Sequence, residues 1–205
     1  TAGNTTATAC WEPAAIETEP GEVRLFFARE RPGEQEIASM KSRDSGRTWA
    51  APEQASLRPK FRDGMPVPAR LASGRVVLSV EDNGLVPAFF APPFRPTIVS
   101  VGSGERWPAL AADREHPSNR TNIAAPYLVA LPGGTTLLAA QSNEDERPFH
   151  RMVVYVGDTA ARNFMSRSLP FGLPEGSSLE WNSLCAVGRD GVIALTSGSI
   201  DGRGG

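Results

Sequence analysis

Two glutamates, Glu12 and Glu81, have the chemistry and the placement expected of catalytic groups. Glu12 precedes a predicted strand and Glu81 ends a predicted strand of the next repeat unit, so we expect both carboxyl groups to face one central cavity. Glycoside hydrolysis needs such a pair, because one carboxyl group protonates the departing oxygen while the second attacks the sugar or activates water. The structural alternative is that each glutamate only forms an ion pair with Arg62 or Arg120.

Several residues close to these glutamates are candidates for holding a sugar. Trp11 and Trp181 take the same position in two repeat units. Their rings would offer apolar platforms for a sugar, unless they only pack inside their own sheets. The other candidates for substrate binding are polar and lie in the segments that lead into the first strands of the repeat units: Arg62, Asp63, Arg120 and Asn182. We expect Arg62, Asp63 and Arg120 to surround the cavity rim.

The elements that must position these residues come from a repeat. In four places along the chain, a proline or serine is followed eight residues later by a glycine: Pro13 and Gly21, Pro66 and Gly74, Pro126 and Gly134, Ser183 and Gly191. Four residues after each glycine stands a leucine: Leu25, Leu78, Leu138 and Leu195. Strands joined by glycine-centred turns at intervals of 53 to 60 residues are typical of propeller blades. We predict an all-β fold, a β-propeller of four-stranded blades, with one domain over residues 1–205 and units starting near 13, 66, 126 and 183.

The remaining strands of each unit are less regular. Residues 36–40 and 152–156 read as third strands, whereas the proline-rich residues 85–121 predict an elaborate loop. The fourth unit stops after its second strand, at the glycine-rich residues 201–205. Because a propeller closes only when its last blade meets its first, we expect a larger ring. Its missing N-terminal blades and final strand would come from the rest of the full-length chain.

The segment Ser42–Trp49, with the sequence Ser-Arg-Asp-Ser-Gly-Arg-Thr-Trp, combines turn chemistry with an apolar anchor. Asp44 can accept hydrogen bonds from nearby backbone N–H groups, Gly46 can supply a positive φ, and Trp49 anchors the outgoing strand. These features predict a hairpin tip. The octapeptide resembles the Asp box, or BNR repeat, of the sialidase-like β-propellers, and this resemblance implies a ring of six blades.

Two more segments resemble the exo-arabinanase family of sialidase-like propellers: Cys-Trp-Glu-Pro at 10–13 and Gly-Met-Pro-Val at 64–67, with Glu81 at the end of the following strand. The resemblance implies an exo-acting hydrolase of an arabinan-like glycan, in which Glu12 and Glu81 serve as nucleophile and acid/base, in an order left open. Such a retaining pair lies about 5–5.5 Å apart, against about 6.5–9.5 Å for an inverting pair. One member should have a raised pKa, because an acid must hold its proton near neutral pH.

Two alternatives stay open at this point. A true sialidase would use an arginine cluster and a Tyr–Glu nucleophile, for which Arg62, Arg120 and Tyr127 are the available counterparts. A non-catalytic carbohydrate-binding or scaffold propeller would carry the two glutamates incidentally.

Alternation of strand direction sorts the turns onto two faces. The glycine turns and the Ser42–Trp49 turn share one face, whereas the starts of first strands and the ends of second strands share the other. We therefore expect the Ser42–Trp49 turn to be structural and remote from the glutamates.

Composition restricts the partners. The chain has 21 Lys+Arg against 23 Asp+Glu, a net charge of −2 and a pI near 5.8, which gives no electrostatic case for nucleic acid or a membrane. A neutral carbohydrate fits better. With isolated His116 and His150 and only Cys10 and Cys185, we expect no metal, no cofactor and two buried free thiols.

A polysaccharide substrate favours an extracellular or periplasmic location. Two glycosylation sequons, at Asn4 and Asn119, add little to it. The chain starts at Thr1 without a basic and then apolar leader, so we expect a trimmed or processed N-terminus.

Overall fold

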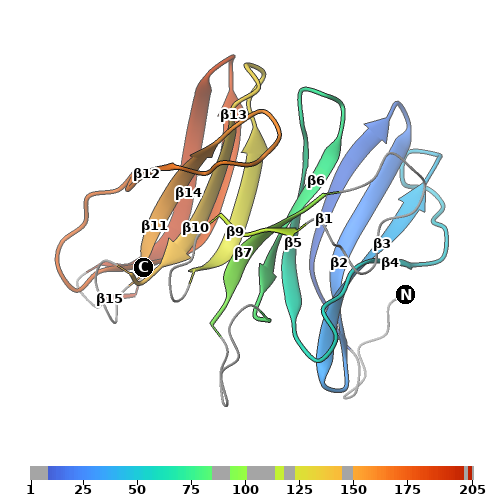
Figure 1. Cartoon of the computed structure of the whole chain (residues 1–205), viewed down its shortest axis with the longest axis horizontal. Helices are drawn as coiled ribbons and strands as arrows, with labels where there is room; N and C mark the ends of the chain where they lie inside the picture. Colours follow the sequence, from blue (N-terminus) through green and yellow to red (C-terminus); the bar gives the residue numbers. More distant parts are fainter. Residues whose placement is uncertain are drawn as a thin grey trace.

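The structure is a computed structural model that describes residues 9–84, 93–100, 114–117, 123–144, 150–200 and 203–204. All regular elements in these ranges are strands, which form four antiparallel sheets standing side by side (Figure 1). The first sheet holds β1 (Cys10–Glu19), β2 (Glu22–Arg31), β3 (Glu34–Ser42) and β4 (Glu53–Ser56). The second holds β5 (Asp63–Arg70), β6 (Val76–Asp82), β7 (Arg95–Ser100) and β8 (Arg114–Glu115).

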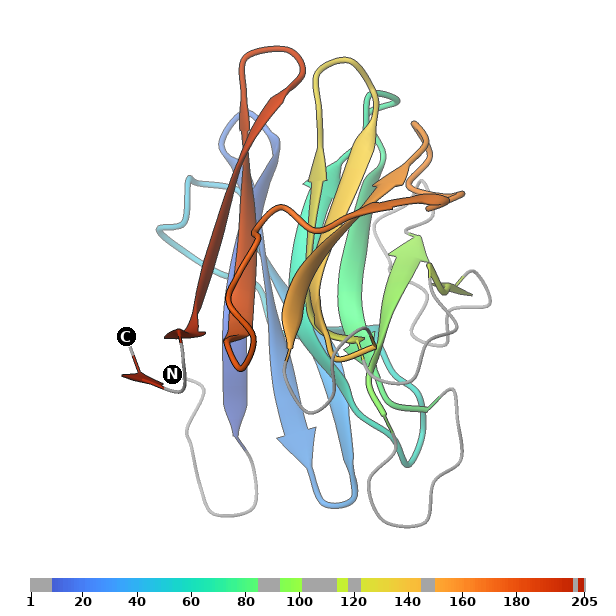
Figure 2. The ribbon, with the colours of Figure 1, turned by 90° about the vertical axis from the view of Figure 1, so that its left-hand side faces the viewer.

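The other two sheets follow the same plan of consecutive strands. The third holds β9 (Ile123–Ala130), β10 (Thr136–Ser142), β11 (Arg151–Gly157) and β12 (Ser166–Ser168). The fourth holds β13 (Ser178–Val187), β14 (Gly191–Ile200) and β15 (Arg203–Gly204). Turned by 90°, the sheets lie face to face as neighbouring blades (Figure 2). The predicted all-β propeller is confirmed, with the four repeat leucines in four separate sheets.

The apolar core lies between successive blades. Phe26 of β2 packs against Leu78 of β6, and Leu138 of β10 packs against the second blade. On the other face of β10, Leu137 meets Leu184 of the fourth blade. Side chains alternate across a strand, so neighbouring residues of one strand serve two different blade interfaces.

The first strand of each sheet has a bulge at the same place. The residue at the bulge has a positive φ although none is glycine: Glu12 at 55°, Met65 at 47°, Ala125 at 49° and Trp181 at 54°. Such conformations are costly for residues with side chains and cluster at functional sites. In every sheet the bulge lies within the first four residues of the first strand.

These bulges correct the alignment of the fourth unit by one residue. Asn182, not Ser183, follows the bulge residue as Pro13, Pro66 and Pro126 do. Ala194 therefore takes the place of Leu78 and Leu138 and packs against the third blade, whereas Leu195 is 57 % exposed. The slip arose because Gly191 stands one position later in its hairpin than the other turn glycines.

Two predictions about loops were wrong. Residues 85–121 do not form only a loop, because β7 and β8 lie within them and complete the second sheet. The fourth unit does not stop after its second strand, because β15 pairs with β14. The third strands predicted at 36–40 and 152–156 are confirmed as parts of β3 and β11.

The Ser42–Trp49 turn is held by its own polar side chains. The Asp44 carboxylate accepts hydrogen bonds from the Thr48 amide at 2.8 Å, the Thr48 hydroxyl at 2.6 Å and the Ser42 hydroxyl at 2.7 Å. These bonds lower the pKa of Asp44 to about 2. The amide of Ser45 also donates to the carbonyl of Gly21 at 2.9 Å, which joins this turn to the first hairpin tip.

Cys10 and Cys185 do not form a disulfide with each other, and only Cys10 is half-buried. Cys185 is exposed, contrary to expectation, because β13 presents it on the face of the fourth sheet that no described blade covers. The described residues contain no helix long and apolar enough to cross a membrane. Among those same residues, no group of three or more His, Cys, Asp or Glu could hold a metal.

Candidate active site

The structure brings Glu12 and Glu81 to one hollow of about 330 Å³ at the bulge end of the first two blades. Glu12 sits at the bulge of β1, and Glu81 sits near the end of β6. The other lining residues come from both blades: Trp11, Glu30, Gln35, Arg62 and Phe94. The two glutamates and Arg62 thus share one cavity, as the sequence predicted.

Gly64 shows how closely the carboxylates approach. A Cβ atom placed on Gly64 would lie 3.6 Å from Glu12 Oε2 and 3.6 Å from Glu81 Oε2. These two oxygens are therefore separated by no more than twice that distance. Two carboxyl groups that face one space at this range suit the acid and nucleophile, or acid and base, of a glycosidase.

Backbone amides of the next blade hold both carboxylates. The amide of Met65 donates to Glu12 Oε2 at 2.7 Å, and the amide of Ala125 donates to Glu81 Oε1 at 2.6 Å. Both donors are bulge residues, so the strained backbone aims each N–H at a side chain of the preceding blade. The oxygen Oε2 of Glu81 is left facing the gap above Gly64.

The environment of Glu81 favours its protonated form. The pKa of Glu81 is raised from an ordinary 4.5 to about 7, mainly by burial and to a smaller extent by the nearby Glu12 charge. The Ala125 amide and Arg62 act in the opposite direction but do not outweigh burial. Glu81 can therefore hold a proton close to neutral pH, whereas Glu12 is exposed to solvent.

The polar wall of the hollow includes residues that the sequence did not reveal. Glu30 accepts a hydrogen bond from Trp11 Nε1 at 3.2 Å, which fixes the half-exposed indole beside the glutamates. Gln35 accepts from Arg62 at 2.8 Å and donates to the carbonyl of Asp63 at 2.9 Å. Glu30 lies two residues beyond Ala28, the position equivalent to Glu81, so the strand register could have identified it.

Asp63 does not reach the rim, contrary to prediction. It precedes Gly64 in β5 and so faces the opposite side of the sheet, where it is fully buried. Arg114 donates to both of its carboxylate oxygens at 3.0 and 2.6 Å and to Asp82 at 2.7 Å. Arg58 also binds Asp82, at 2.7 Å. This buried cluster joins β5 and β6 directly behind Gly64 and Glu81.

The remaining candidates are spread more widely. Trp181 is 61 % exposed at the fourth bulge, and it aligns with Glu12 rather than with Trp11 because of the one-residue slip. Asn182 is buried and accepts a hydrogen bond from Thr196 at 3.3 Å. Neither residue lines the hollow of the glutamates. Arg120 lies outside the described residues.

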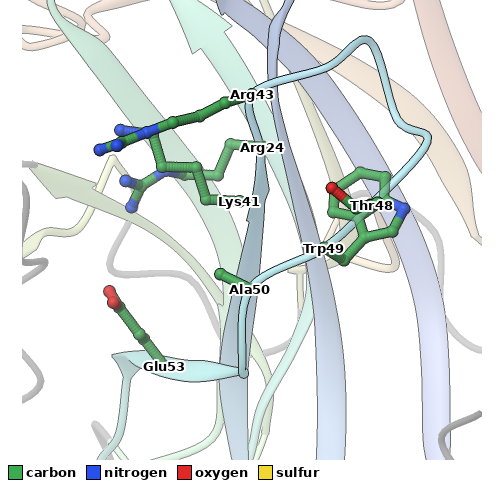
Figure 3. Close-up of a pocket in the computed structure, with 7 residues that line it drawn as sticks. All are labelled: Arg24, Lys41, Arg43, Thr48, Trp49, Ala50 and Glu53. Carbon is green, nitrogen blue, oxygen red and sulfur yellow. The ribbon is translucent and has the colours of Figure 1, made fainter.

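A second hollow of about 530 Å³ lies at the other end of the first blade, beside the Ser42–Trp49 turn. Arg24, Lys41 and Arg43 extend from one side of it, and Trp49 lies on the other side (Figure 3). Lys41 is already paired with Glu22 at 2.8 Å. Glu53 is the single carboxylate in its lining, so this hollow lacks the acid pair that hydrolysis requires.

Comparisons with known proteins place the fold. No protein-family model and no curated protein matches the chain. Among solved structures, the α-L-arabinofuranosidase Arb93A of Fusarium graminearum has a TM-score of 0.72 at 18 % identity, with 96 % of this chain and 55 % of that chain covered. The Penicillium chrysogenum α-L-arabinanase, solved with arabinobiose, has a TM-score of 0.66 at 17 % identity, covering 97 % and 56 %.

A protein of unknown function from Dyadobacter fermentans matches with a TM-score of 0.68 at 15 % identity, covering 93 % of this chain and 50 % of that chain. The chain thus spans about half the length of these solved structures. Its strands are arranged as in these proteins along almost the whole sequence. The chain therefore has the same β-propeller fold as this arabinofuranosidase and this arabinanase.

Proposed function

We propose that this protein is an exo-acting glycoside hydrolase that removes sugar units from an arabinan-like polysaccharide or oligosaccharide by a retaining mechanism. The observation that carries the proposal is the hollow in which Glu12 and Glu81 face each other across Gly64. The structural likeness to an arabinofuranosidase and an arabinanase supports the choice of glycan. Such a substrate implies an extracellular or periplasmic location.

The two carboxyl groups take different roles. Glu81 carries the proton, because its pKa of about 7 keeps it partly protonated at neutral pH. It donates this proton to the departing glycosidic oxygen while the Glu12 carboxylate attacks the anomeric carbon. Glu81 then takes a proton from water, which displaces Glu12 from the glycosyl intermediate with a second inversion. The reaction as written uses no cofactor.

The rest of the hollow would bind the sugar. Trp11 offers an apolar face that Glu30 holds in place, and Arg62 and Gln35 offer hydrogen bonds to hydroxyl groups. Trp181 would extend this surface toward a further sugar unit. A sialidase is less well supported, because Arg62 is the one arginine that lines the described hollow and Tyr127 packs against the core between the third and fourth blades.

Further blades would complete the ring. Val187, Ile193 and Leu195 of the fourth blade are about half exposed or more. Their equivalents in the third blade, Leu131, Leu137 and Ala139, are buried between the third and fourth blades. An apolar sheet face of this kind suits another blade, and the sixfold ring implied by the family resemblance would supply one.

A glycan panel tests the proposal. The full-length protein is incubated with arabinan, arabino-oligosaccharides, sialylated glycans and other plant and microbial polysaccharides, and released sugars are quantified. We expect release from the ends of arabinan-like chains, with first-formed products that keep the anomeric configuration. Binding without release would favour the carbohydrate-binding propeller, and release of sialic acid would favour the sialidase.

A further inference from the structure

The four repeat units differ at the residue just before the bulge. Trp11, Ala124 and Glu180 occupy this position in the first, third and fourth blades, whereas the second blade has Gly64. The left-handed residue is the next one, Met65, so the backbone at Gly64 does not demand glycine. Three side chains at the equivalent position show that the bulge accepts them.

The backbone conformation does not explain why residue 64 is a glycine, but the space above its Cα atom does. A Cβ atom at Gly64 would lie in ordinary contact with Glu12 Oε2 and Glu81 Oε2, at 3.6 Å from each, and 2.9 Å from Gln35 Nε2. A methyl group would thus stand between the two carboxylates. Reacting atoms must approach within about 3–3.5 Å of each other, so a sugar carbon needs this same gap.

We propose that Gly64 is a specificity-determining residue that forms the floor of the substrate position, and that its missing side chain is what admits the reacting sugar ring between Glu12 and Glu81. This inference rests on the proposed function, since it states where in the hollow the substrate lies. It predicts that the reacting ring lies flat against the bare Cα of Gly64, a place that Ala124 closes in the third blade.

Gly64→Ala tests the floor directly, with Gly172→Ala as the matched control. Gly172 lies between β12 and β13, and a Cβ there would meet nothing within 4 Å. We expect Gly64→Ala to lower kcat/KM by roughly 100-fold or more, since misplacement by about 1 Å has this effect. The control should keep wild-type activity. A Gly64→Ala variant with wild-type kcat/KM would overturn the inference while leaving the proposed function intact.

Gln35 requires a second variant, because the new methyl group would press on its side chain. The double variant Gly64→Ala/Gln35→Ala relieves that 2.9 Å contact and keeps the gap filled. Its kcat/KM is compared with that of Gln35→Ala alone, which isolates the effect of the methyl group from the loss of Gln35. A similar further loss supports the inference, and recovery to the level of Gln35→Ala overturns it.

A readout that needs no substrate separates this inference from the proposed function. Carbon-13 NMR follows the titration of the Glu81 carboxyl in wild type and in Gly64→Ala. The groups facing it are Glu12 and Arg62, which are unchanged in the variant. A methyl group in the gap displaces water, so we expect the Glu81 midpoint to rise. If the wild type hydrolyses no glycan, the proposed function fails. If the titration midpoint of Glu81 is the same in Gly64→Ala as in the wild type, Gly64 does not control the space between the two carboxylates, and the inference fails.

Discussion

The second and third blades have the same backbone at the end near the hollow, but the second blade has acidic side chains where the third has uncharged ones. The second blade places Asp63, Gly64, Glu81 and Asp82 there, and the third blade has Ile123, Ala124, Gln141 and Ser142 at the equivalent positions. Both blades have the bulge, and both accept a hydrogen bond from a backbone amide of the next blade. Glu81 accepts the amide of Ala125 at 2.6 Å, and Gln141 accepts the amide of Trp181 at 3.1 Å.

The difference separates structural needs from chemical ones. A neutral amide in the third blade makes the same link between blades, so this link does not require a carboxylate. Ile123 and Ser142 are buried where the second blade buries Asp63 and Asp82 with Arg114. Buried ion pairs are weak contributors to stability compared with apolar residues. The charges of the second blade are therefore better explained by the site that they support.

Glu81→Gln should produce the largest effect, because it gives the second blade the amide that the third already has. The variant keeps an acceptor for Ala125 but loses the proton that hydrolysis needs. We expect activity to fall by roughly 10²–10⁴-fold, with a melting temperature no lower than that of the wild type. Kinetics on the best substrate of the panel and thermal unfolding provide the two measurements. A fully active variant would remove Glu81 from the mechanism.

Arg114→Met breaks the charged cluster without replacing it. The variant removes the cation that binds both Asp63 and Asp82. Among the described residues, Arg58 then remains paired with Asp82, so we expect a loss of about 3–5 kcal/mol in the free energy of unfolding. Denaturant unfolding measures this loss. The variant Asp63→Ile/Asp82→Ser/Arg114→Met imitates the third blade and should regain most of the stability. Failure to regain it would show that the two blades are not interchangeable at this level.

The sequence predicted the blades because local signals repeat along the chain. Glycine turns and alternating apolar residues identify paired strands, and strand alternation correctly placed Glu12 and Glu81 on one face. The slip of one residue in the fourth unit occurred because Gly191 moved within its hairpin, and no local rule detects that shift. It misaligned Trp181 with Trp11, and it aligned Leu195 instead of Ala194 with Leu78 and Leu138.

The polar surroundings of the site could not be predicted in the same way. Arg114 lies far from Asp63 in the sequence, and only the pairing of β8 in the second sheet brings the two together. Gln35 reaches Arg62 across a blade interface for the same reason. Contacts of this kind depend on packing between elements, and a repeat pattern contains no information about them.

Truncation of Glu81 and of Gln141 compares the hydrogen bonds that link the second and the third blade to the blade that follows each of them. Glu81→Ala and Gln141→Ala each leave a backbone N–H without its acceptor, and we expect each to cost about 1–3 kcal/mol in the free energy of unfolding. Glu81→Gln should show no such cost, which distinguishes the link from the charge. Denaturant unfolding of all three variants measures the series. Equal stability of Glu81→Ala and the wild type would contradict a structural role of this bond.

The pH dependence of stability gives the most specific difference. Because the folded state raises the pKa of Glu81 from 4.5 to about 7, it binds this proton more tightly than the unfolded chain does. The stabilisation is therefore complete below about 4.5 and is lost as the pH rises to about 7. The free energy of unfolding should contain this decline in the wild type, and Glu81→Gln should lack it. Identical pH profiles of the two proteins would contradict the assignment.

The titration of the Glu81 carboxyl, followed by carbon-13 NMR in the wild type and in Glu12→Gln, tests most directly whether the two glutamates act as a pair. Their shared hollow predicts a midpoint of about 7 in the wild type. It also predicts a lower midpoint in Glu12→Gln, because the charge of Glu12 disfavours ionisation of Glu81. A midpoint near the ordinary 4.5, or one that does not respond to Glu12→Gln, would show that the two carboxyl groups do not face each other across Gly64.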